Sequence, residues 1–71
     1  MPLSPKKLLL SKWTARHPAH REKHFMVTRV LLPEIDGPVR HVDLQAVLSG
    51  RTEIIEWREL NDSSRWITGW K

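Results

Sequence analysis

The order of apolar and polar side chains predicts three β-strands in the middle of the chain. Residues 24–32 are rich in β-branched and large apolar side chains, and Pro33 closes the run, as is typical of a strand. Residues 41–48 alternate, so that their apolar side chains fall on one face. A third strand is predicted over residues 53–60, where the alternation is irregular and a β-bulge fits. These segments predict a mainly β fold built on a three-stranded antiparallel sheet.

The segments outside these strands lack a comparable pattern. Residues 1–7 contain two prolines and no periodicity, and we expect a flexible arm there. Residues 6–15 fit either a short helical turn or an irregular extended segment. Residues 16–23 are polar and contain Pro18, which predicts a loop. Residues 66–70, with a tryptophan at each end, are expected to form a short C-terminal turn or edge segment.

One segment allows a second interpretation. Asp43 could cap a short helix over residues 44–49 that stops at Gly50. The alternation and the short spacing to the next strand favour a hairpin instead. A small α+β fold is therefore the alternative to the mainly β fold.

The same period of two residues selects a candidate core. It places Arg29 on the same face as Phe25 and Val27, and Trp57 on the same face as Ile55. Each of the four tryptophans can bury ~150–250 Å², so most of them are expected to close the core of so short a chain. The predicted core comprises Phe25, Val27, Val42, Leu44, Ala46, Ile55, Trp57, Leu60 and Trp66.

Length and composition indicate one domain without disulfides. The chain has 71 residues and no cysteine, so residues 1–71 are expected to form a single small domain. The longest apolar run near the start, residues 8–10, is too short for a signal-peptide core or a membrane span. We therefore expect a cytoplasmic protein that does not associate with a membrane.

The formal net charge of +4 is unevenly distributed. Residues 1–32 contain seven lysines or arginines and one acid, whereas residues 33–71 contain five and seven. A basic half can attract nucleic acid or an acidic partner, or its charge can be neutralised by the other half after folding. The candidate binding surface comprises Lys6, Lys7, Leu9, Lys12, Trp13, Arg16, Arg21 and Lys23.

The histidines and serines form no recognisable catalytic or metal-binding pattern. His17, His20 and His24 have spacings found among zinc ligands, but Pro18 interrupts them and no cysteine accompanies them. His41 could supply only a further nitrogen. The sequence contains neither a nucleophile elbow nor a glycine-rich phosphate loop. We therefore expect no catalytic residue, no metal and no cofactor.

A recognisable pattern is formed by residues 6–15, 23–25, 45–48 and 57–60, followed by Asp62, Trp66, Gly69 and Trp70. Together these segments resemble a bacterial family of short tryptophan-rich conserved hypothetical proteins. The resemblance covers nearly the whole chain. It implies one compact domain in a bacterial cytoplasm, and it implies no activity, cofactor, partner or site residue.

Two binding functions agree with these features. In the first, the protein is a non-enzymatic interaction module whose apolar and basic arm, with Leu9 and Trp13, docks on a protein partner or on a second copy. In the alternative, the cations contact phosphates and an exposed ring such as Trp13 stacks on a base of RNA or another single-stranded nucleic acid. The apolar residues among the cations favour the protein partner.

Overall fold

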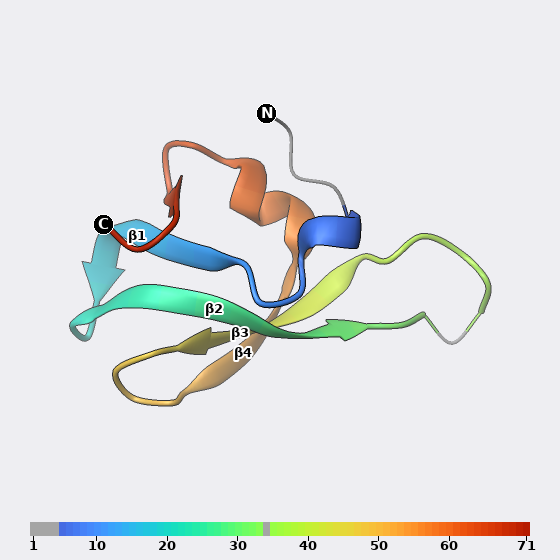
Figure 1. The fold of residues 1–71 in the computed structure, drawn as a ribbon, viewed down its shortest axis with the longest axis horizontal. Coiled ribbons are helices and arrows are strands. Elements are labelled where there is room, and N and C mark those ends of the chain that lie inside the picture. The colour runs from blue at the N-terminus through green and yellow to red at the C-terminus, as the bar shows by residue number, and fades with distance from the viewer. Residues whose placement is uncertain (1–4, 34) are drawn as a thin grey trace.

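Five antiparallel strands form one sheet in this protein (Figure 1). The structure is a computed structural model that describes residues 5–33 and 35–71. Along the chain the elements are η1 (Pro5–Lys7), β1 (Lys12–Ala19), β2 (Glu22–Leu31), β3 (His41–Ala46), β4 (Thr52–Glu56), η2 (Trp57–Asn61) and β5 (Trp66–Thr68), where η denotes a 3-10 helix. The strand order is β4-β3-β2-β1-β5. The mainly β prediction is confirmed, but the sheet has five strands instead of three.

The two central predicted strands correspond to β2 and β3. The predicted segments 24–32 and 41–48 overlap β2 and β3, which pair from Phe25↔Ala46 to Leu31↔His41. Because residues 41–46 pair on both sides, with β2 and with β4, the short-helix alternative is wrong. A turn follows β3 and leads into β4.

The predicted loop at residues 16–23 is wrong, because most of it belongs to a long β1–β2 hairpin. His20 and Arg21 form its turn with φ of 53° and 63°, the left-handed conformation that two-residue hairpin turns use. The ladder is irregular between Thr14 and Ala19, and Pro18 lies in that stretch. A proline is tolerated there because no regular ladder bond requires its missing N–H.

The predicted third strand is shorter than expected. β4 ends at Glu56, where η2 begins, so the segment 53–60 is half strand and half 3-10 helix. The Glu59 carboxylate accepts the backbone N–H of Glu56 at 3.1 Å, which is half of a capping box. The turn of η2 directs Leu60 into the core, where only 2% of it is exposed.

The predicted C-terminal turn contains a strand. Trp66–Thr68 forms β5, which pairs with Trp13–Ala15 of β1. Figure 1 shows this last segment, in red, lying beside β1. η1 covers residues 5–7 of the predicted flexible arm, and residues 1–4 of that arm lie outside the described residues.

A bulge in β2 changes which side chains face the core. The pairing register with β3 shifts between Val27 and Arg29. The shift places Val30 opposite Val42, and Arg29 opposite Asp43. Arg29 therefore does not share the core face of Phe25 and Val27, as a strict two-residue period predicted.

The core is formed where β1, β2 and β3 meet η1 and η2. The buried hydrophobic residues are Leu8, Trp13, Phe25, Val27, Val42, Leu44, Ala46 and Leu60. Ile55, Trp57 and Trp66, which were also predicted as core, are partly buried against this cluster. Leu8 and Trp13 were missing from the predicted core. Trp13 is only 3% exposed, and its indole N–H donates to the Ser11 hydroxyl at 2.8 Å.

Candidate functional site

Within the described part of the chain, the ion pairs neutralise most acids of the later half but leave most cations of the first half unpaired. Most acids of the later half are held by arginines, since the ion pairs of the described residues are Arg29–Asp43, Arg40–Glu56, Arg51–Glu22, Arg51–Glu53 and Arg65–Glu59. Within residues 5–33 and 35–71, the cations without an ion pair are Lys6, Lys7, Lys12, Arg16, Arg21, Lys23, Arg58 and Lys71. Six of these eight come from the basic first half. Folding therefore leaves most of the positive charge of that half available to a ligand.

The structure divides the predicted binding surface into exposed and buried parts. Exposed members are Lys6 and Lys7 on η1, Leu9 in the turn before β1, Lys12 and Arg16 on β1, Arg21 in the hairpin turn, and Lys23 on β2. Trp13 is the exception, because it faces the core. Arg16 is held at the segment between η2 and β5, where its Nε–H donates to the Ser63 carbonyl at 2.5 Å. The docking arm expected from the sequence therefore lacks its tryptophan.

A different tryptophan takes that place on the surface. Trp70 is 41% exposed, and the Lys12 ammonium lies 4.8 Å from the centre of its ring. The centre of the His24 ring, on strand β2, lies 6.1 Å from the centre of the Trp70 ring. His24 also lines a hollow of about 250 Å³ with Arg21 and Lys23. We call the residues that contact Trp70 or share this hollow with His24, together with Lys71, the Trp70 face; it comprises Lys12, Arg21, Lys23, His24, Trp70 and Lys71.

Trp70 was not among the residues predicted to form the binding surface, although the sequence contains a signal for the strands that position it. Residues 12–16 alternate polar and apolar side chains, as a strand does, and Ile67 and Thr68 are β-branched. Strands predicted at both positions would have indicated that the N-terminal and C-terminal segments both belong to the sheet and can lie side by side. Only the pairing itself shows that Trp70 reaches Lys12 and His24.

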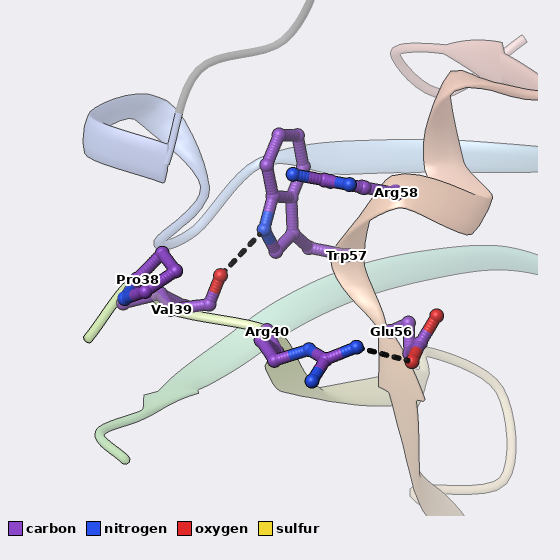
Figure 2. Close-up of a pocket in the computed structure, with 6 residues that line it drawn as sticks. All are labelled: Pro38, Val39, Arg40, Glu56, Trp57 and Arg58. Carbon is purple, nitrogen blue, oxygen red and sulfur yellow. Dashed lines mark hydrogen bonds and ion pairs between the residues drawn. The ribbon is translucent and has the colours of Figure 1, made fainter. Parts of the chain in front are cut away.

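A second hollow lies at the start of η2. It has a volume of about 280 Å³ and is lined by Pro38, Val39, Arg40, Glu56, Trp57 and Arg58. Figure 2 shows the Trp57 indole N–H directed at the Val39 carbonyl, which accepts it at 2.8 Å, and Arg40 directed at Glu56. The Arg58 guanidinium lies 5.8 Å from the centre of the indole. The Trp57 ring is partly buried and shares its hollow with the acid Glu56, whereas the Trp70 ring is exposed.

One buried carboxylate connects the two hairpins. Glu22 is 5% exposed and receives hydrogen bonds from Arg51, the shortest at 2.7 Å, and from the Ser49 hydroxyl at 2.5 Å. The bonds from Arg51 and then from Ser49 lower the pKa of Glu22 to about 2. Hydrogen bonds from Ser64 likewise lower the pKa of Asp62. Both carboxylates are thus held as anions inside structural contacts.

The histidines lie on separate elements. His17 is on β1, His20 is in the hairpin turn, His24 is on β2 and His41 begins β3. In the part of the chain that the structure describes, no three histidines or carboxylates form a group that could hold a metal ion. The same part contains no helix that is long and apolar enough to cross a membrane.

Comparison with known protein families matches residues 11–71 to a family described as "Tryptophan-rich protein (DUF2389)". The chain belongs to this tryptophan-rich family. The match covers all five strands and η2, and leaves out only the residues up to Leu10. No curated protein and no solved structure matches the chain. Because the family has no established function, the chemistry of the site must be argued from the geometry of its residues.

Proposed function

We propose that the protein binds a nucleic acid strand through the Trp70 face. The observation that supports this proposal is the charge on that face. Lys12, Arg21, Lys23 and Lys71 have no ion pair among the described residues, while the acids nearby in the fold are held by arginines. Cations that fold without an acidic partner can neutralise phosphates and release their counterions.

The proposal differs from the protein-docking arm that the sequence favoured. That arm relied on Leu9 and Trp13, and the burial of Trp13 removes the larger of its two apolar anchors. The Trp70 face instead combines an aromatic ring with cations, the combination that single-strand binding surfaces use. As part of the same proposal, the protein is a non-enzymatic binding module of the bacterial cytoplasm, which agrees with a basic chain that lacks cysteine.

The salt dependence of binding tests this proposal. We expect the wild-type protein to bind a short single-stranded oligonucleotide with log Kobs falling linearly against log salt concentration. Replacing Lys12 and Lys23 by glutamine should reduce the steepness of that slope by roughly 1.4, because a single-strand contact contributes about 0.7 per phosphate. Fluorescence anisotropy at several salt concentrations measures both quantities.

The control variant removes the same charge elsewhere. Replacing Arg40 and Arg58 by glutamine lowers the net charge equally, but at the hollow around Trp57. This variant should keep the wild-type slope. Equal losses in the two variants would mean that net charge alone attracts the strand, and no binding by the wild type at low salt would refute the proposal.

A second copy of the chain is the second candidate partner, and exposed apolar side chains favour it. Leu32 is 82% exposed and Ile54 is 62% exposed, and both line a hollow of about 320 Å³. Ile54 lies on β4, an edge strand of the sheet. The backbone N–H of Ala46 donates to the Arg51 carbonyl and that of Trp57 to the Arg40 carbonyl, which defines the alternation of hydrogen-bonded pairs in the β3–β4 ladder. By that alternation, the backbone groups of Ile54 point to the open edge, where β4 of a second copy could pair.

Sedimentation of the protein over a range of concentrations tests this candidate. We expect the mass to rise toward that of a dimer, and Ile54→Lys to remain monomeric because it places a charge at the centre of the paired edge. Leu48→Lys is the matched control, since Leu48 is exposed in the turn after β3. A wild-type protein that is monomeric throughout the range would refute self-association.

A further inference from the structure

Trp70 is exposed but firmly held. Its indole N–H donates to the Phe25 carbonyl at 2.9 Å. On its two sides the backbone is anchored by Thr14, whose hydroxyl donates to the Gly69 carbonyl at 2.6 Å and accepts the Lys71 N–H at 2.9 Å. Gly69 has a φ of 84°, a conformation that favours glycine and that turns the chain back over β1. The ring therefore has a fixed position on the outer side of the β1–β2 hairpin.

The other three tryptophans are more covered. Trp13 faces the core, Trp66 packs edge-on against Phe25 with ring centres 5.3 Å apart, and Trp57 lies against Arg58. Of the four tryptophans, Trp70 alone is exposed. A rigid, exposed aromatic ring loses little conformational freedom when a ligand covers it.

The groups around Trp70 are suited to a nucleotide. The Lys12 ammonium lies 4.8 Å from the ring centre and makes no ion pair among the described residues, so nothing acidic keeps it there. At an exposed site a lysine over a ring is held more weakly than a stacked base. A base can therefore replace the ammonium over the ring, and the ammonium can move to the phosphate that accompanies the base.

We propose that Trp70 is a stacking platform that makes the Trp70 face selective for single-stranded over double-stranded nucleic acid. This inference rests on the proposed function and adds the class of strand. In a duplex the faces of the bases are covered by their neighbours, so only an unpaired strand offers a base to Trp70. Lys12, whose ammonium lies over the ring, and Lys71, the residue that follows Trp70 in the chain, contact the phosphates of the stacked nucleotide.

The experiment compares a single strand with a duplex of the same length and uses variants of one residue. Oligothymidylate and a mixed-sequence duplex are titrated against the wild type, Trp70→Leu and Trp70→Phe by fluorescence anisotropy at one salt concentration. We expect the wild type to prefer the single strand. Trp70→Leu should lose roughly 5- to 100-fold in affinity for the single strand, in line with the loss of one stacked base, and should keep its affinity for the duplex.

Tryptophan fluorescence provides a second readout that does not depend on the leucine variant being folded. The single strand should quench the wild-type emission, and most of that quenching should disappear in Trp70→Phe, which retains a ring that can stack. Equal affinity of the wild type for single strand and duplex, with no quenching that depends on Trp70, would refute the platform while leaving the phosphate-binding proposal intact. Absence of binding to either nucleic acid would refute both.

Discussion

Replacing Trp13 by alanine is expected to remove a large share of the free energy of unfolding of this protein. Trp13 is 3% exposed and packs in the core cluster, so its truncation leaves a cavity. Removing a buried tryptophan costs about 3–5 kcal/mol. A domain of 71 residues has a free energy of unfolding on the order of 4–11 kcal/mol, so one substitution removes a large share of it. Thermal melting followed by far-UV circular dichroism should show a drop of roughly 10–40 °C.

Two variants separate packing from hydrogen bonding at this position. Trp13→Phe retains most of the apolar contact but loses the indole N–H that donates to the Ser11 hydroxyl. Ser11→Ala removes the acceptor and keeps the ring. Both should cost about 1–3 kcal/mol, less than the alanine variant. If Trp13→Ala melted within a few degrees of the wild type, Trp13 would not be the core residue that the structure shows.

Replacing Arg51 by methionine is expected to destabilise the protein strongly at neutral pH and much less in acid. Glu22 is nearly buried, and Arg51 donates to both of its carboxylate oxygens. Without the guanidinium, a buried carboxylate would be left with the Ser49 hydroxyl as its remaining partner. The melting temperature at pH 7 should therefore fall by more than for any exposed ion pair.

The sign of the pH dependence follows from the pKa of Glu22. Its folded pKa of about 2 lies below the ordinary value of 4.5 for a glutamate, so the unfolded state binds the proton more readily. The stabilisation is complete above pH 4.5 and is lost as the pH falls toward 2. The difference in melting temperature between the wild type and Arg51→Met should narrow over that window.

The matched control is Arg65→Met. Arg65 pairs with Glu59 at 3.3 Å on the surface, where both side chains are largely exposed, so its loss should change the melting temperature little at any pH. Glu22→Gln provides a second check, because it removes the titrating group itself. If the difference in melting temperature between the wild type and Arg51→Met stayed constant from pH 7 to 2, ionisation of Glu22 would not be the cause of the destabilisation.

Local sequence determined the central strands and most of the core. In β2 and β3 the period of two residues is short-range information, since it depends only on which neighbouring side chains are apolar. It selected Phe25, Val27, Val42, Leu44 and Ala46, all of which the structure buries. Pro33 ended the strand predicted at residues 24–32, because proline cannot continue a ladder.

The same local pattern was insufficient where strand pairing involves distant residues. Residues of β1 were predicted as a helical turn or irregular extended segment followed by a loop, because the polar residues 16–18 include Pro18 and interrupt the alternation, and β5 has only three residues. β1 pairs with β2 in a hairpin and also with β5, and β5 becomes a strand by pairing with β1 across more than fifty residues of sequence. The bulge in β2 likewise moves Arg29 to Asp43, and a register shift of this kind is set by the partner strand.

The sequence by itself determined that this protein is a small, mainly β, tryptophan-rich domain with a basic first half. Only the tertiary structure decided which tryptophan faces the core and which faces solvent, and which charges remain unpaired. The physical reason is that composition and periodicity act between neighbours, whereas burial and ion pairing depend on contacts between segments far apart in the chain. Trp13 is buried and Trp70 is exposed because β5 brings the C-terminal segment onto the outer side of the β1–β2 hairpin.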